Sequence, residues 1–202
     1  MAATDTSASA RTVAGVTRGP SSNAHPALLA AGARVEAAST RGTRLIPVEE
    51  FYTGPKRNAL APDELIRAVH IDVAAGPQQF AKVGTRNAMV IAACAFALAL
   101  HPAARTVRTG IGSAAPTPVR AREAEDFLGG VLDEGGHWDT GRPVPPSAAR
   151  RFAELAAGAC SPIDDVRGSA AYRRHAVGVL ARRTLHWTWT AYAGNEGGAR
   201  CA

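Results

Sequence analysis

The chain has 202 residues with a formal net charge of +6, and 46% of its residues are hydrophobic although only 5% are aromatic. This is enough apolar material for a packed core, which must be built mainly from Ala, Val, Leu and Ile. The excess of basic residues would suit an acidic partner. It includes no dense basic run interleaved with aromatic residues, so nucleic-acid binding is not expected.

The spacing of the cysteines and the lengths of the apolar runs indicate the cellular compartment. Cys94, Cys160 and Cys201 are widely spaced, which argues against a disulfide framework and against a zinc or iron–sulfur site within this chain. The longest apolar run, Ala88–Leu100, is shorter than the ~20 residues of a membrane-spanning helix, and the start lacks the apolar core of a signal peptide. We therefore expect a cytoplasmic protein without a membrane span.

The first part of the chain, up to about residue 76, predicts a short helix followed by strands. Residues 1–18 show no sustained period and are expected to be flexible. A turn at Gly42 and the alternation of apolar with polar residues indicate the strands. The predicted elements are a helix over Pro26–Ala31, a hairpin that joins Arg34–Ala38 to Thr43–Val48, a turn whose aromatic pair Phe51–Tyr52 closes the sheet edge, and a strand over Leu65–Val73.

Ala74–Pro77 is the best candidate for a domain boundary, because glycine and proline end regular structure there. Beyond it the pattern predicts strands over Gln79–Thr85 and Thr106–Gly112. Ala92–Leu100 is ambiguous, because an alanine-rich run also suits a helix, and the pattern favours helix entry near Arg86–Ile91 with a strand after it. The large residues of the middle strand share one face. Gly110 and Gly112 in the last strand permit another backbone segment to approach closely.

The last part of the chain predicts three helices. A threonine–proline pair opens the first, Gly129–Gly130 stops it, and Ser147 and Ser169 cap the other two. The predicted segments are helices over Thr117–Leu128, Ser147–Ala157 and Ser169–Leu185, a surface loop over Leu132–Pro146, and an irregular tail over residues 187–202.

The third predicted helix has an apolar and a basic face. Tyr172, Ala176, Val179 and Leu180 form its expected inner face. The arginines expected to face outward into solvent are Arg173, Arg174, Arg182 and Arg183.

The residues by themselves indicate an α+β protein whose chemistry is not visible. The sequence contains no nucleophile elbow, no paired carboxylates and no glycine-rich phosphate loop. His70 is expected on the polar side of its strand, because no second ligand stands at a metal-site spacing from it.

Five short stretches, in order along the chain, resemble one family of redox proteins. Two precede the boundary: Phe51-x-Thr53-Gly54-Pro55 and Leu60-x-Pro62-Asp63-Glu64-Leu65-Ile66. Three follow it: Phe80-x-Lys82-x-Gly84-x-Arg86, Ala115-Pro116-Thr117-Pro118-Val119-Arg120-Ala121-x-x-Ala124-Glu125 and Asp165-x-Arg167-Gly168-Ser169-Ala170-x-Tyr172-Arg173-Arg174. The series resembles the FAD-binding medium subunit of the molybdenum hydroxylases, the carbon monoxide dehydrogenase and xanthine dehydrogenase group.

The resemblance implies a fold and a division into domains. Residues 19–76 resemble the end of a vanillyl-alcohol-oxidase-type FAD-binding domain. Residues 77–186 resemble a small antiparallel-sheet-plus-helices domain of the carbon monoxide dehydrogenase flavoprotein C-terminal type. Residues 1–18 and 187–202 match neither.

The resemblance also implies a function, that of a flavoprotein oxidoreductase subunit. In the family, FAD receives electrons from an iron–sulfur small subunit, which takes them from a molybdopterin large subunit, and passes them to an acceptor. Lys82 matches a lysine near the flavin, where a fixed cation can stabilise the negative charge of the reduced ring. Leu65 and Ile66 match an apolar contact to the ring, with ordinary core packing as an equally good account. Arg86 is a candidate partner for a carboxylate or a phosphate.

Two departures from the family pattern define the alternatives. Asn23 stands where the family has an aspartate in a Ser-Pro-x-x-Asp motif, and the sequence lacks the glycine-rich loops that hold the FAD pyrophosphate through backbone N–H groups. The chain therefore resembles an N-terminally truncated member. The alternative functions are a non-catalytic docking module and a remnant that no longer binds FAD.

Overall fold

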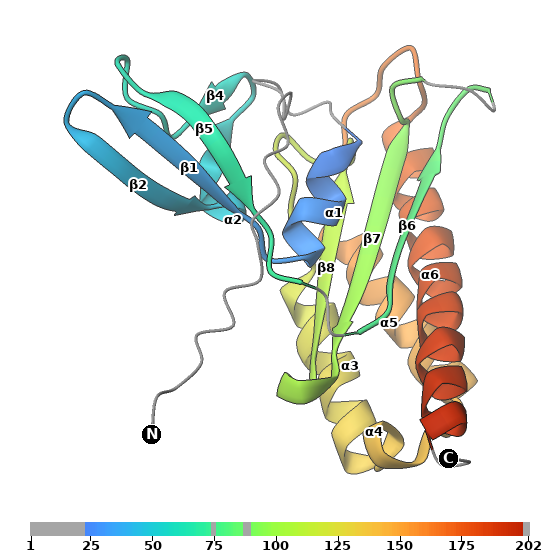
Figure 1. Cartoon of the computed structure of the whole chain (residues 1–202). Helices are drawn as coiled ribbons and strands as arrows, with labels where there is room; N and C mark the ends of the chain where they lie inside the picture. Colours follow the sequence, from blue (N-terminus) through green and yellow to red (C-terminus); the bar gives the residue numbers. More distant parts are fainter. Residues whose placement is uncertain (1–22, 74–75, 87–89, 200–202) are drawn as a thin grey trace, which may run out of the picture.

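The computed structural model describes residues 23–73, 76–86 and 90–199, in which helices and strands are mixed. A small strand-rich part is followed by a larger part in which helices cover a sheet (Figure 1). The helices are α1 (Ala24–Ala30), α2 (Val48–Phe51), α3 (Arg122–Glu134), α4 (His137–Thr140), α5 (Pro146–Gly158) and α6 (Ala170–Ala199), with a short 3-10 turn η1 (Pro102–Ala104). The strands are β1 (Arg34–Ser39), β2 (Gly42–Pro47), β3 (Tyr52–Gly54), β4 (Arg57–Asn58), β5 (Leu65–His70), β6 (Gln78–Val83), β7 (Cys94–His101) and β8 (Thr106–Gly112).

All the strand pairs are antiparallel, and they form three small sheets in the described part of the chain. The first sheet has the order β2-β1-β5, the second pairs β3 with β4, and the third has the order β6-β7-β8. The alternation of apolar and polar residues predicts the hairpin around Gly42 and the three strands after the boundary, and both predictions are confirmed. The predicted strand over Leu65–Val73 ends earlier than expected, at His70.

The middle strand β7 is buried along almost its whole length because both faces of its sheet are covered. Its large residues and its alanines alternate, so each kind occupies one face. The alanines Ala97 and Ala99 pack with Ala30 of α1 on one side. On the other side α3, α5 and α6 supply the covering layer (Figure 1).

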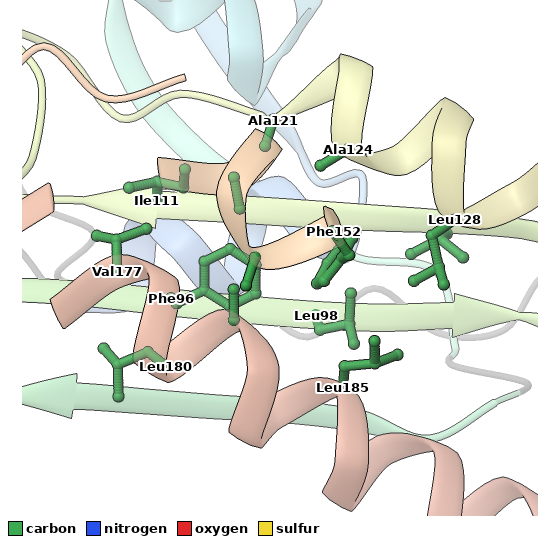
Figure 2. Close-up of a cluster of buried hydrophobic side chains, with 14 of the residues drawn as sticks. Phe96, Leu98, Ile111, Ala121, Ala124, Leu128, Phe152, Val177, Leu180 and Leu185 are labelled. Carbon is green, nitrogen blue, oxygen red and sulfur yellow. The ribbon is translucent and has the colours of Figure 1, made fainter. Parts of the chain in front are cut away.

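The main core lies between this sheet and the three long helices, as Figure 2 shows. Phe96 pairs across the sheet with Ile111 and meets Phe152 of α5 edge to face, with ring centroids 6.3 Å apart. Leu128 of α3 and Leu185 of α6 complete the layer. Burying each such side chain stabilises the fold by about 1.5–3 kcal/mol.

A second core lies under the sheet β2-β1-β5. Leu28 and Leu29 of α1 pack there with Val35, Phe51 and Val69. The short helix predicted over Pro26–Ala31 is therefore confirmed as α1, which belongs to this second core and also packs Ala30 on the alanine face of β7. Phe51 and its neighbour Tyr52 are buried in this core, but the turn predicted around them is the helix α2 followed by the strand β3.

The helix predicted from Thr117 to Leu128 is wrong at both ends. Val119 forms a β-bridge with Ile111, with N···O distances of 2.8 and 3.1 Å, and this holds the chain extended until α3 begins at Arg122. The pair Gly129–Gly130 lies inside α3 instead of ending it. A helix-interior glycine costs about 1 kcal/mol relative to alanine, and the buried Leu128 and Leu132 on either side offset that loss.

The irregular tail predicted after His186 is also wrong, because α6 continues to Ala199. Trp189 and Tyr192 lie one turn apart and are buried against Trp138 of α4. The Trp189 Nε1 donates to the Arg142 carbonyl at 2.8 Å, and the Tyr192 hydroxyl donates to the Trp138 carbonyl at 2.7 Å. These contacts supply the tertiary support that the local sequence does not reveal. They also show that the predicted loop over Leu132–Pro146 contains a helical turn, α4.

The predicted faces and caps of the last helices are partly corrected. Arg173 is buried instead of solvated, and Tyr172 is 47% exposed instead of lining the inner face. Ser169 caps α6 as predicted, since its Oγ accepts from the Tyr172 N–H at 3.2 Å. Ser147 does not cap α5, which begins at Pro146 without a side-chain cap.

Two predictions fall wholly or partly outside the described residues. The flexible start over residues 1–18 lies entirely outside them. Of the helix entry near Arg86–Ile91, residues 87–89 lie outside, and the described residues on either side of that gap are not helical.

Candidate functional site

Helix α1 lies unusually close to the backbone of β8. A side chain at Gly110 would overlap the backbone of Pro26, and one at Gly112 would meet the Pro26 ring. The close approach predicted for these two glycines is confirmed. It fixes the first turn of α1 against the sheet, and with it Asn23 just before the helix.

Two of the residues predicted to hold the cofactor meet at one backbone carbonyl. The Lys82 Nζ on β6 and the Asn23 Nδ2 each donate to the Val90 oxygen at 3.3 Å. Both side chains are half-buried. An ammonium group has three donors, so the Val90 carbonyl leaves Lys82 with donors available to a ligand.

Gly84 explains how this carbonyl comes to lie beside Lys82. A Cβ at Gly84 would stand 2.6 Å from a methyl carbon of Val90, closer than side-chain atoms approach one another. The glycine therefore lets the returning chain pack on the end of β6, and the Ala93 N–H then donates to the Val83 carbonyl at 2.7 Å. The spacing Lys82-x-Gly84 thus has a structural reason.

The other three predicted site residues have no hydrogen bond to this carbonyl among the described residues. Leu65 begins β5 in the first sheet and is 66% exposed, while its neighbour Ile66 is half-buried against the second core. Arg86 is exposed just after β6. Neighbouring residues of a strand point to opposite faces of the sheet, so Leu65 alone offers exposed apolar surface there, while Ile66 packs toward the core.

Three of the five motif stretches meet at a cavity of about 580 Å³. Pro55 and Lys56 come from the turn between β3 and β4, Ser113 follows β8, and Asp165 and Arg167 come from the loop before α6. Lys56 and Ser113 both have a φ of +58°, in the left-handed region that non-glycine residues rarely adopt. Strained backbone of this kind gathers at ligand sites more often than elsewhere.

A buried ion pair fixes one wall of this motif cavity. Arg173 is 3% exposed and donates to the Ser113 carbonyl at 2.7 Å and to the Asp165 carboxylate. Arg167 donates to the other oxygen of the same carboxylate. Hydrogen bonds from Arg167, joined by those from Arg173, hold the pKa of Asp165 well below its usual range. The loop before α6 is therefore held rigidly.

A second ion-pair network joins the small strand-rich part to the helical layer. Arg120 donates to Glu49 of α2 at 3.0 Å and to Glu125 of α3. The buried Glu125 also accepts from the N–H and the hydroxyl of Thr109, both at 2.7 Å. Because every one of these groups is partnered, the network sets how the two parts meet.

The sequence singled out Lys82 and Asn23 but could not find their meeting point. Val90, whose carbonyl joins them, lies in an apolar run without any polar signal. The Arg173–Asp165 pair was present in a motif, yet the helical pattern placed the arginine on the outside. Burial of an arginine depends on its distant partners.

The fold and the site define a class of protein, and comparison with known proteins agrees. The model of the FAD binding domain in molybdopterin dehydrogenase matches residues 9–73. The model of the CO dehydrogenase flavoprotein C-terminal domain matches residues 79–188. The chain belongs to this family of flavoproteins. The expected α+β fold class is confirmed as well.

Curated relatives have the same character. The chain is 32% identical over 165 residues to the nicotine 6-hydroxylase medium subunit of Paenarthrobacter nicotinovorans. The aligned region covers 78% of this chain and 53% of that protein. It is 29% identical over 172 residues to the carbon monoxide dehydrogenase medium chain of Afipia carboxidovorans, with coverages of 83% and 56%. The chain thus spans about half the length of these relatives.

Solved structures match with similar extents. Reconstituted CO dehydrogenase from Oligotropha carboxidovorans gives a TM-score of 0.73 at 25% identity, covering 86% of this chain and 58% of that one. Quinoline 2-oxidoreductase from Pseudomonas putida 86 gives a TM-score of 0.73 at 21% identity, covering 87% and 59%. The second match concerns the fold alone.

Two searches of the described residues complete the description. None of their helices is both long and apolar enough to cross a membrane. Within the same ranges, no group of three or more His, Cys, Asp or Glu side chains is placed to hold a metal ion.

Proposed function

We propose that this chain is part of the FAD-binding subunit of a molybdenum-hydroxylase-type oxidoreductase. The subunit receives electrons from an iron–sulfur small subunit, which a molybdopterin large subunit supplies, and passes them to an acceptor. Relatives named as medium subunits or medium chains support a complex of this kind. A cytoplasmic location belongs to the same proposal.

The convergence of Lys82 and Asn23 on the Val90 carbonyl carries the proposal. FAD, when bound, supplies the oxidation–reduction chemistry. Lys82 would supply a positive charge to the bound ring, which would stabilise the negative charge that the ring gains on reduction. Asn23 offers an amide that donates and accepts hydrogen bonds, in the place of the family's aspartate.

The three remaining residues complete the proposed contacts. Leu65 provides an apolar contact for the flat ring, because covering its exposed side chain removes apolar surface from water, and Ile66 supports this strand end from the core side. Arg86, exposed after β6, pairs with a phosphate of the cofactor through its planar guanidinium.

The test is a titration of the purified full chain with FAD, followed by the visible absorbance of the flavin. Lys82→Met should weaken binding about tenfold or more, because a hydrogen bond from a charged group contributes about 1.5–3 kcal/mol. Arg34→Met is the matched control. It removes an exposed cation on β1 that pairs with Asp72 at 3.3 Å, and it should leave FAD affinity unchanged.

Two results would contradict the proposal. One is the absence of flavin binding by the full chain at high FAD concentration. The other is an equal loss of affinity in the Lys82 and Arg34 variants, which would indicate a general charge effect instead of a site.

A second candidate function, docking without flavin, is favoured by the loop before α6. Its base is held by the Arg173–Asp165 pair, while Ile163 is 68% exposed and Val166 is fully exposed. A rigid loop that presents two apolar side chains suits a partner subunit. In co-expression, flavin-free chain should capture the iron–sulfur or molybdopterin subunit, and Val166→Asp should abolish the capture. If neither subunit is captured, the docking function is wrong.

A further inference from the structure

The largest apolar hollow among the cavities described here lies between α5, the loop 141–146 and the second half of α6. Its volume is about 850 Å³, within the range of about 300–1,000 Å³ typical of small-molecule sites. Leu185 and Trp189, both buried, form part of its floor, and Val144 and Ala149 line its sides. It lies apart from the residues assigned above to the flavin.

The wall of this α5–α6 cavity is fixed in place by hydrogen bonds. The Arg142 carbonyl in the loop accepts from Trp189 Nε1 at 2.8 Å and contacts His137 Nδ1 at 3.1 Å. Gly141 turns the loop with a φ of +65°, beside Ala193 of α6. The cavity is therefore preformed, which lowers the entropic cost of binding a ligand.

The rim carries positive charge that the described residues leave unpaired. Arg150, Arg182 and Arg183 line the cavity and are exposed, and no carboxylate is among its lining residues. Within the described ranges none of the three arginines forms a salt bridge. The next carboxylate on α5, Glu154, pairs with Arg151 at 3.3 Å instead.

We propose that the α5–α6 cavity binds a small organic carboxylate with an apolar body. The apolar floor accommodates the hydrocarbon part, and the guanidinium groups at the rim accept the carboxylate in their planar two-donor geometry. Trp187, 44% exposed at the same rim, covers part of the bound hydrocarbon.

The experiment titrates the full chain with octanoate and follows tryptophan fluorescence and calorimetric heat. Octanoate should bind at least tenfold more tightly than 1-octanol, which has nearly the same body without the charge. The double variant Arg182→Gln/Arg183→Gln should lose about tenfold in octanoate affinity. Trp187→Phe should remove most of the fluorescence change while the heat of binding remains.

Arg151→Gln is the matched control, because Arg151 is exposed on α5 beside Arg150 but does not line the cavity. Its octanoate affinity should equal that of the parent chain, and circular dichroism should show every variant folded. Equal losses in the Arg151 and Arg182/Arg183 variants would overturn the proposal, as would equal binding of the alcohol. Displacement of octanoate by equimolar inorganic phosphate would also overturn it, because the apolar body would then contribute nothing.

Discussion

The two faces of the β6-β7-β8 sheet are built in opposite ways. On the helical face, large side chains such as Phe96 interlock with Phe152 of α5 and with the other helices. On the other face, Ala97 and Gly110 stand opposite each other in register and leave room for the backbone of α1. The helical face mainly stabilises the fold, while the other face fixes the position of α1. Because α1 packs closely on β8, Asn23 is held beside Val90 and Lys82.

The largest effect is expected on the helical face. Phe152→Ala should lower the free energy of unfolding by about 3–5 kcal/mol, because it removes a fully buried ring and leaves a cavity. Chemical denaturation measures the change. Phe80→Ala, at a 39% exposed position on β6, is the control and should lose far less. Similar losses at both sites would mean that the core is not where the fold places it.

A smaller loss of stability with a larger loss of function is expected on the α1 face. Gly110→Ala should destabilise the chain by about 1–3 kcal/mol, because the added methyl overlaps the Pro26 backbone. It should also weaken FAD binding by moving Asn23. Denaturation and FAD titration measure the two effects.

Gly129→Ala is the matched control for that change. Gly129 lies within α3 with open space where its side chain would stand. The substitution should stabilise the chain by about 0.5–1 kcal/mol and leave FAD affinity unchanged. Equal responses at the two glycines would contradict the close approach of α1.

The end of α6 should respond more weakly. Tyr192→Phe removes the hydrogen bond to the Trp138 carbonyl and should cost about 1 kcal/mol of stability, measured by thermal unfolding. Tyr172→Phe, at an exposed site near the start of the same helix, should change stability by less than half as much. If both were neutral, the hydrogen bond from Tyr192 would not contribute to holding the last turns of α6.

The smallest effect is a dependence on acid pH. The pKa of Asp165 is lowered in the folded chain by hydrogen bonds from Arg167 and then Arg173. Its contribution to stability is therefore present above the ordinary aspartate pKa of about 3.9 and is lost as pH falls through the lower folded value. Asp165→Asn should flatten the fall of stability below about pH 4, measured by denaturation across pH. An equally steep fall of stability in the variant and in the parent chain would contradict the account.

The sequence predicts local elements well and distant contacts poorly. Alternation within a few residues predicts β6 and β8, and the glycines of β8 indicate the close approach. For β7 the alternation favours a strand, although its alanines also suit a helix. The start of α3 was missed because Val119 pairs with Ile111, and the end of α6 because its partner Trp138 lies some fifty residues away. Intrinsic helix propensity does not include the stabilisation that comes from such distant contacts.

The candidate site shows the same division. Lys82 and Asn23 came from motif resemblance, and the structure brings them to one point. The Val90 carbonyl between them depends on Gly84 and the path of the returning chain. The domain boundary and the cofactor-binding roles of all five residues, Lys82 and Asn23 included, stay predictions.

The most direct test of the account is a double-mutant cycle between Asn23 and Lys82, read as FAD affinity. The cycle compares the parent chain with Asn23→Ala, Lys82→Met and the double variant in FAD titrations. If both side chains act on the flavin at one place, the double variant should lose less than the sum of the single losses, with a coupling of about 0.5–3 kcal/mol. Losses that add to within about 0.5 kcal/mol would mean that the two residues act independently, and the central claim would be wrong.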